Sequence, residues 1–102
     1  MDETLNLGGN IELSGFHEID GSTMIVVKKI VGNYTKKLSE RVKNFEKLKL
    51  TMKPVHEREK SEVYELHANL FCGGKPYTAS MADRNLFFAL DKVLKKIEGE
   101  IQ

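Results

Sequence analysis

The segment from Leu86 to Ile101 constrains the fold more than any other part of the chain. Its apolar residues recur every three or four positions, so at about 100° per residue they form one stripe along a helix. The stripe consists of Leu86, Leu90, Val93, Leu94, Ile97 and Ile101. The other side is basic and carries Arg84, Lys92, Lys95 and Lys96. The pattern predicts a closing helix with one buried face and one basic face, and Asp83 is its expected N-cap.

A second amphipathic helix is predicted from Ser22, as its N-cap, to about Glu40. Its apolar stripe consists of Val27, Ile30, Val31, Tyr34 and Leu38. Basic residues again lie away from that stripe, with Lys29 and Lys36 opposite it and Lys28 and Lys37 on its flanks. Gly32 sits among the polar residues and costs about 1 kcal/mol relative to alanine. We interpret it as a tolerated exposed glycine in preference to a point of close approach.

Apolar and polar residues alternate in four further segments, which predicts strands. These strands are expected at Asn10–Phe16, Phe45–Lys53, Ser61–Phe71 and Lys75–Met81. Gly73 and Gly74 both tolerate positive φ and predict a hairpin between the last two strands. Pro54 cannot donate a ladder hydrogen bond, so it either ends its strand or lies at an edge. Residues 1–9 are expected to form a flexible lead-in, and residues 56–60 a charged turn.

The predicted element order is β-α-β-β-β-α, which indicates an α+β fold in a single domain over residues 10–102. Each helix has one apolar stripe and each later strand has one apolar face. The economical solution is a two-layer sandwich, a four-stranded sheet with both helices packed on one face and the last three strands in an antiparallel meander. The basic sides of the two helices would then share one outer surface. The open face of the sheet would carry Lys47, Lys49, Glu65, His67 and Thr78.

The net charge of +1 conceals an uneven distribution of charge along the chain. Residues 1–20 contain five acidic residues and no Lys or Arg, whereas residues 21–60 contain eleven Lys or Arg against four Glu. A nearly neutral total argues against indiscriminate binding to nucleic acid. The basic middle of the chain is compatible with a directed basic surface.

Several other classes of function find little support in the residues. No apolar run approaches a membrane span, and the acidic start does not resemble a signal peptide. Cys72 is the only cysteine, which excludes an internal disulfide, fits a reducing, cytoplasmic compartment and suits a small apolar residue. The three histidines lie far apart in sequence, and no metal-binding, nucleophile-elbow or phosphate-loop motif is present. We therefore expect no enzymatic activity, no small-molecule substrate, no cofactor, no metal and no membrane association.

Gly73-Gly74-Lys75 resembles a fragment of a phosphate-binding loop, but it leads into a strand and not into a helix N-terminus. A hairpin turn is therefore the preferred interpretation of this motif.

Two basic helix faces lying side by side can follow a phosphate backbone through Coulomb attraction and counterion release. From spacing alone, this interpretation is as probable as an ordinary solvated surface. Tyr34, Phe87 and Tyr77 are assigned to the apolar stripes, which leaves few aromatic rings to stack on bases. This favours recognition of structured RNA through its shape and backbone. The candidate RNA-binding residues are Lys28, Lys29, Lys36, Lys37, Arg41, Arg84, Lys92, Lys95 and Lys96.

Motifs along most of the chain resemble the ribosome hibernation-promoting factor and ribosome-associated inhibitor family, also called sigma-54 modulation proteins. Residues 10–15 (NIELSG) are similar to its opening strand pattern, N-I-x-I-x-G. Val27, Ile30, Val31 and Leu38 match hydrophobic positions of its first helix. Gly73-Gly74-Lys75 with Tyr77 and Ala79 resembles its last hairpin. Residues 86–92 (LFFALDK) resemble the family's M-Y-A-A-I-D-K, and Lys96-Ile97-Glu98 its later K-L-E.

The resemblance implies a function as well as a fold. Members of this family bind the small ribosomal subunit, occupy the decoding channel where tRNA and mRNA would sit, and silence translation under stress. Lys37, Lys92 and Lys96 match basic family positions, and the other six candidates rest on the helix-face argument alone. We expect a monomer that binds ribosomal RNA and acts by steric occlusion.

Two alternatives stay open. The first is a general structured-RNA-binding domain that uses the same surface. The second is a protein-interaction module that kept the fold without RNA affinity, with an exposed sheet edge near Lys53-Pro54 that recruits a partner strand.

Overall fold

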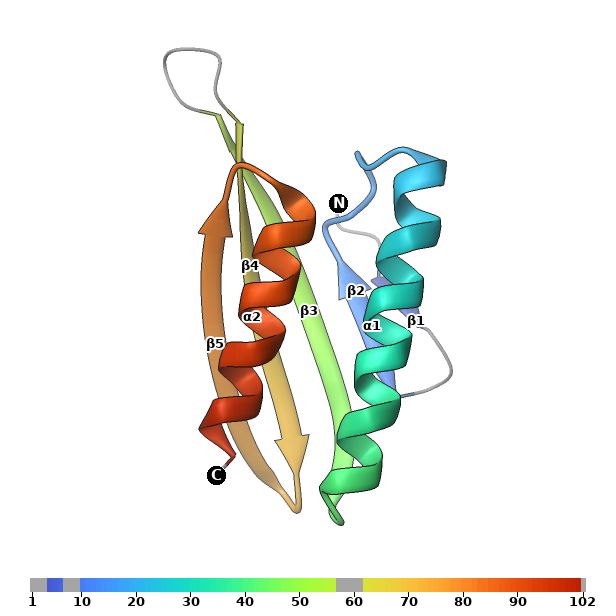
Figure 1. Ribbon diagram of the computed structural model, residues 1–102, viewed down its shortest axis with the longest axis vertical. Helices are drawn as coiled ribbons and strands as arrows, with labels where there is room; N and C mark the ends of the chain where they lie inside the picture. The colour runs from blue at the N-terminus through green and yellow to red at the C-terminus, as the bar shows by residue number, and fades with distance from the viewer. Residues whose placement is uncertain (1–3, 7–9, 57–61, 102) are drawn as a thin grey trace.

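A computed structural model describes residues 4–6, 10–56 and 62–101. Its elements, in chain order, are β1 (Thr4–Asn6), β2 (Ile11–Ser14), α1 (Gly21–Arg41), β3 (Phe45–His56), β4 (Glu62–Cys72), β5 (Lys75–Asp83) and α2 (Leu86–Glu100). The strands form one mixed sheet in the order β1-β2-β3-β4-β5 (Figure 1). Most of the charged turn expected at residues 56–60 lies outside the described residues.

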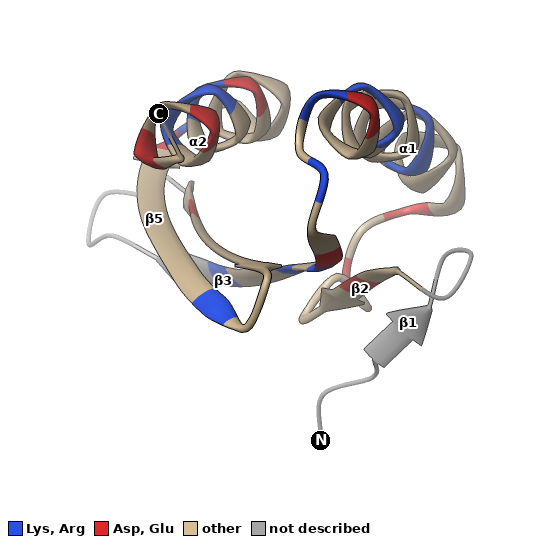
Figure 2. Cartoon of the chain, turned by 90° about the horizontal axis from the view of Figure 1, so that it is seen from below, with Lys and Arg blue, Asp and Glu red and all other residues tan. Residues whose placement is uncertain are grey.

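The helices lie together on one face of the sheet, which confirms the predicted two-layer α+β sandwich (Figure 2). The four predicted strands are β2 to β5, and β3, β4 and β5 form the expected antiparallel meander. Strand β2 pairs with β3 in parallel, because α1 connects the two strands as a crossover. The helices begin at the same end of the molecule and run in the same direction (Figure 1).

The prediction that residues 1–9 form a flexible lead-in is wrong for residues 4–6. These residues form β1, which pairs antiparallel with β2 and adds a fifth, edge strand to the expected four. The pairing joins Thr4 to Ser14 and Asn6 to Glu12. Three residues are too few to show an alternating pattern, so this strand depends on the free edge that β2 offers.

Alternating strand residues and the two helix stripes meet in one hydrophobic core. From the sheet it takes Leu13, Leu48, Leu50, Leu66 and Leu70, each fully buried. From the helices it takes Val27, Val31, Leu38, Leu86, Ala89, Leu90, Val93, Leu94 and Ile97. Full burial of one such large aliphatic side chain stabilises the fold by about 1.5–3 kcal/mol. The core therefore fixes which helix face is left for solvent.

The prediction that Phe87 belongs to the apolar stripe is wrong. Phe87 was expected in the apolar stripe of the closing helix, but its side chain is 37% exposed. At about 100° per residue it falls on the flank of the stripe, which is centred on Leu90, Val93 and Ile97.

The caps of both helices differ from those expected. Asp20, and not Ser22, caps α1: its carboxylate accepts hydrogen bonds from the Thr23 main-chain N–H at 3.2 Å and from the hydroxyls of Ser22 and Thr23. Asn85, and not Asp83, caps α2, and its side-chain oxygen accepts from the Phe88 N–H at 3.0 Å. In both cases a polar side chain on a residue with extended backbone accepts from one free main-chain amide of the first turn.

Two turns depend on positive φ. Gly73 and Gly74, at φ 58° and 81°, form the predicted hairpin between β4 and β5. Gly15 has φ 81°, and a Cβ placed on it would lie 2.2 Å from the main-chain oxygen of Met52. Only glycine allows the chain leaving β2 to pass this close to β3.

Pro54 does not end its strand, since β3 continues to His56 and Pro54 is registered with Tyr64. The registered pairs between β2 and β3 end at Thr51. Pro54 therefore lies in a stretch of β3 that pairs with β4 but not with β2. Pro54 thus occupies an edge position, the second of the two places predicted for it.

Candidate nucleic-acid interface

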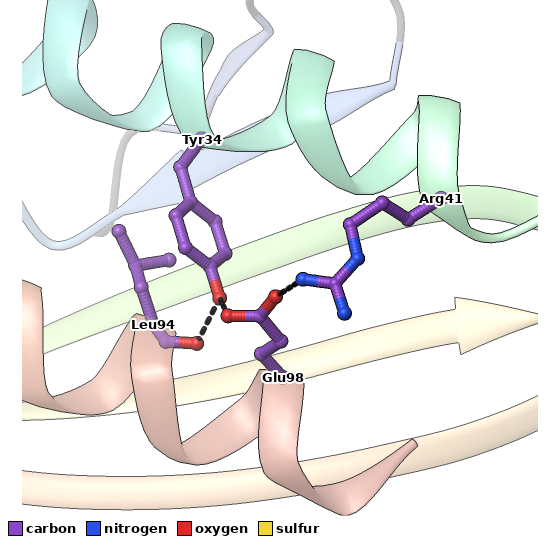
Figure 3. A network of polar contacts seen from close by, with 4 residues as sticks. All are labelled: Tyr34, Arg41, Leu94 and Glu98. Carbon is purple, nitrogen blue, oxygen red and sulfur yellow. Dashed lines mark hydrogen bonds and ion pairs between the residues drawn. The ribbon is translucent and has the colours of Figure 1, made fainter. Parts of the chain in front are cut away.

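The two helices are joined across their outer surface by one polar network (Figure 3). The Tyr34 hydroxyl lies 2.6 Å from the main-chain oxygen of Leu94 and 2.8 Å from a carboxylate oxygen of Glu98. The other carboxylate oxygen of Glu98 accepts from the Arg41 guanidinium. This network sets the spacing of α1 and α2 where they approach, so it also positions the basic residues nearby.

A groove of about 530 Å³ runs between the helices beside this network. Its charged lining residues are Lys37, Arg41, Lys95, Glu40, Asp91 and Glu98. Three basic and three acidic side chains make the groove balanced in charge. A phosphate chain would therefore meet carboxylates as well as cations there.

Within residues 10–56 and 62–101, three of the nine predicted basic residues form ion pairs. Arg41 pairs with Glu98, Lys92 with Asp83 at 2.8 Å and Lys95 with Asp91 at 3.2 Å. In each pair the carboxylate neutralises the cation and so weakens its attraction for a phosphate. These positions are consequently weaker phosphate ligands than the sequence pattern suggested.

The structure does not gather all nine residues on one surface. Lys37, Arg41 and Lys95 share the interhelical groove. Lys92 and Lys96 instead reach toward β5, where Lys92 bonds Asp83 and Lys96 makes a long 3.5 Å contact with the main-chain oxygen of Ser80. Arg84 is exposed in the turn between β5 and α2.

Helix α1 carries the largest group of available cations. Lys28, Lys29, Lys36 and Lys37 are exposed and form no ion pair with any residue that the structure describes. Lys29 and Lys36 stand seven residues apart, which places them two helical turns apart on the same side. These four residues are here called the α1 lysines: Lys29 and Lys36 lie in one line along the solvent side of the helix, and Lys28 and Lys37 lie on its two flanks.

A second basic site was missed at the sequence level. Beyond the C-terminal ends of the two helices lies a hollow of about 370 Å³, here called the end hollow. Arg41, Lys43 and Lys75 line it together with Asn44 and Tyr77, and none of the described residues in its lining is acidic. The only available signal was Lys75 directly after Gly73-Gly74, and the hairpin interpretation of that motif, although right, did not indicate its neighbours.

The open face of the sheet offers less free charge. Lys47 pairs with Glu12 at 2.5 Å, and His67 contacts Glu65 at 2.9 Å along the same strand. The predicted residues do occupy this face, but the charge of Lys47 is satisfied by Glu12 and that of Glu65 partly by His67.

Three titrating groups report on their surroundings. Burial, followed by the hydrogen bond to Glu98, raises the pKa of Tyr34 above its ordinary value. The hydrogen bond from Lys92, and then that from the Asn85 main chain, lowers the pKa of Asp83. Burial, with a smaller effect from Glu46, raises the pKa of the Cys72 thiol, which is buried as expected for a small apolar residue.

Other kinds of site receive no support from the described residues. Among them, no group of three or more His, Cys, Asp or Glu side chains is placed to hold a metal ion. Neither of the two described helices is long and apolar enough to cross a membrane. Comparison of the chain with protein-family models and with curated proteins finds no match.

Proposed function

We propose that this protein is a non-enzymatic, cytoplasmic repressor of translation that binds ribosomal RNA on the small ribosomal subunit. The observation that carries the proposal is the group of α1 lysines, four exposed cations that form no ion pair within the described part of the chain. Cations spread over the solvent side of one helix suit phosphates held at fixed spacing in folded RNA. The motif resemblance to hibernation factors supplies the small subunit as the target and steric occlusion of the decoding channel as the mechanism.

The α1 lysines carry more of this proposal than the residues on α2. Lys92 and Lys95 are held by carboxylates, whereas Lys29 and Lys36 have no such pair with any described residue. If all four α1 lysines contact phosphates, log K should fall by about 3 to 4 units for each tenfold rise in salt. A general structured-RNA-binding domain would show the same salt dependence without a preference for the small subunit.

The test is the fluorescence anisotropy of a labelled fragment of small-subunit RNA, titrated at several salt concentrations. The variant Lys29→Gln/Lys36→Gln should lose about tenfold or more in affinity and show a shallower salt slope. The matched control, Lys49→Gln/Lys53→Gln, removes the same charge from β3 on the open face and should change affinity by less than about threefold. Equal losses in the two variants would contradict a directed surface on α1.

A second candidate function is favoured by a different observation. Exposed apolar side chains gather in the first turns of both helices, which begin at the same end of the molecule (Figure 1). They are Ile25 at 69%, Val26 at 43%, Phe87 at 37% and Phe88 at 60% exposure. Such side chains suit a protein partner, and binding through them would depend only weakly on salt. Retention of a cellular partner by Lys29→Gln/Lys36→Gln and its loss in Phe88→Ala would favour this alternative.

A further inference from the structure

The end hollow brings together cations from three separate parts of the chain. Arg41 is the last residue of α1, Lys43 lies in the connection to β3, and Lys75 begins β5. Seen from this end of the molecule, basic segments appear both in that connection and at the start of β5 (Figure 2). No sequence periodicity relates these positions, so only the fold brings them to one hollow.

The rim of the end hollow is held in place by hydrogen bonds. The Gly73 N–H donates to the main-chain oxygen of Asn44 at 2.8 Å, which ties the β4–β5 hairpin to the connection after α1. The Gly74 N–H donates to the Glu46 carboxylate at 3.0 Å, which ties the same turn to β3. A site that is already ordered loses little conformational entropy when a ligand binds.

The charges of the lining favour an anion over the alternatives. Both helix C-termini border the hollow through Val42 and Ile101, and each carries about half a negative charge. Arg41 is largely neutralised by Glu98, but the two full positive charges of Lys43 and Lys75 still outweigh these two ends. Glu46 and Glu98 stand next to the lining without being part of it: Glu46 accepts from Gly74, and Glu98 pairs with Arg41. Arg41 has five N–H donors, so this pair leaves others for a ligand.

The hydrogen-bonding groups of the lining match a phosphate group. The Arg41 guanidinium provides forked donors, Lys43 and Lys75 provide mobile ammonium groups, and Asn44 and Tyr77 add an amide and a hydroxyl. A phosphate has several acceptor oxygens that can use donors from different directions. A volume of about 370 Å³ accommodates a phosphate or pyrophosphate group together with water.

We infer that the end hollow is a binding seat for a phosphate group, supplied either by an RNA backbone or by a free phosphorylated small molecule. The seat is separate from the α1 lysines, since it shares none of those four residues. It does not depend on binding to the ribosome, and the two proposals can fail independently.

The experiment is a titration of the isotope-labelled full chain with inorganic pyrophosphate, followed by amide NMR shifts. Saturable shifts should concentrate at Asn44, Gly73 and Gly74. The variant Lys43→Gln/Lys75→Gln should weaken binding by about tenfold or more. The control Lys49→Gln/Lys53→Gln, which removes the same charge from β3 outside the end hollow and the α1 lysines, should change it by less than about threefold. Shifts that are absent, or equally weakened in the two variants, would overturn the inference.

A second variant tests whether a negative charge beside the seat weakens binding of the phosphate group. Glu46→Gln keeps an acceptor for the Gly74 N–H and removes one negative charge beside the seat, so pyrophosphate should bind several-fold more tightly. No tightening would count against the seat.

Repeating the titration with a short oligoribonucleotide separates the two sources of the phosphate group. Tighter binding than that of pyrophosphate, with the same shifts, assigns the seat to RNA. Tighter binding of pyrophosphate assigns it to a small phosphorylated molecule.

Discussion

The hydroxyl of Tyr34 lies 2.8 Å from a carboxylate oxygen of Glu98, and this contact joins α1 to α2. The same hydroxyl lies 2.6 Å from the Leu94 main-chain oxygen, while Glu98 also holds Arg41. One carboxylate thus serves two purposes: it fixes the spacing of the helices and it neutralises a basic residue beside the interhelical groove. Both consequences can be tested separately.

Loss of the Tyr34 hydroxyl should destabilise the fold and change its response to high pH. Tyr34→Phe should lower the free energy of unfolding by about 1 kcal/mol near neutral pH. The raised pKa of Tyr34 means that the folded state keeps this proton when the unfolded state, near pH 10, releases it. The stabilisation is therefore complete below about pH 10 and is lost as pH rises toward the folded-state pKa.

Urea unfolding of wild type and Tyr34→Phe at a series of pH values measures both effects. The difference between the two proteins should be constant up to about pH 10 and shrink above it. A difference that stays constant, or that grows with pH, would contradict the role of the buried hydroxyl.

Removing the charge of Glu98 should strengthen binding to RNA. Glu98→Gln keeps an oxygen for Tyr34 but no longer pairs ionically with Arg41, so the groove gains net positive charge. Affinity for structured RNA should rise roughly two- to fivefold at low salt, and the gain should fade as salt screens it. Glu65→Gln on the open face is the matched control and should have little effect. An equal gain in the two variants would mean that only total charge matters.

Two glycines should respond to alanine in opposite directions. Gly15→Ala should cost roughly 2–4 kcal/mol, because the new Cβ meets the main-chain oxygen of Met52 and φ is 81°. Gly32→Ala should stabilise the fold by about 1 kcal/mol, because nothing lies within 4 Å of its Cβ and the position is helical.

Thermal unfolding of both glycine variants is sufficient to check this. RNA affinity of Gly32→Ala adds a second result, since an unchanged value supports the tolerated-glycine interpretation. A loss of affinity with intact stability would instead show that a ligand approaches the helix closely there.

The Asp20 carboxylate, which caps α1, should make the stability of the fold depend on pH in acid. Hydrogen bonds from Ser22 and then Thr23 favour the charged carboxylate and lower the pKa of Asp20 from 3.8 to about 2. The stabilisation is therefore present above about pH 4 and is lost as pH falls through 2. Asp20→Asn keeps a good cap but cannot titrate. The melting temperature of wild type should therefore fall relative to that of this variant as the pH drops from about 4 to about 2. Parallel curves for the two proteins would argue against Asp20 as the cap.

Periodicity predicted the elements that pack against the core, and it failed where only local geometry decides. The stripes of Val27 and Leu90 follow from helical spacing, and the alternation around Leu48 and Leu66 follows from the strand period. The choice of Asp20 over Ser22, and of Asn85 over Asp83, depends on backbone angles that a residue pattern does not specify. Strand β1 is too short to produce a pattern at all.

The candidate site was predicted less completely than the fold. Residues such as Lys29 and Lys36 could be placed on an exposed helix face because spacing along one helix is regular. The ion pairs of Lys92 and Lys95, by contrast, depend on rotamers and on neighbouring carboxylates. The meeting of Arg41, Lys43 and Lys75 depends on three elements that only the complete fold brings together.

The most direct measurement is co-sedimentation of the protein with purified small ribosomal subunits from its source cell, at low and moderate salt. We expect salt-sensitive pelleting with small subunits, weaker pelleting with large subunits, and loss of pelleting in Lys29→Glu/Lys36→Glu. The control Lys49→Glu/Lys53→Glu should pellet like wild type. Absence of pelleting with small subunits at low salt, or pelleting that neither salt nor the α1 variant reduces, would contradict the proposed function.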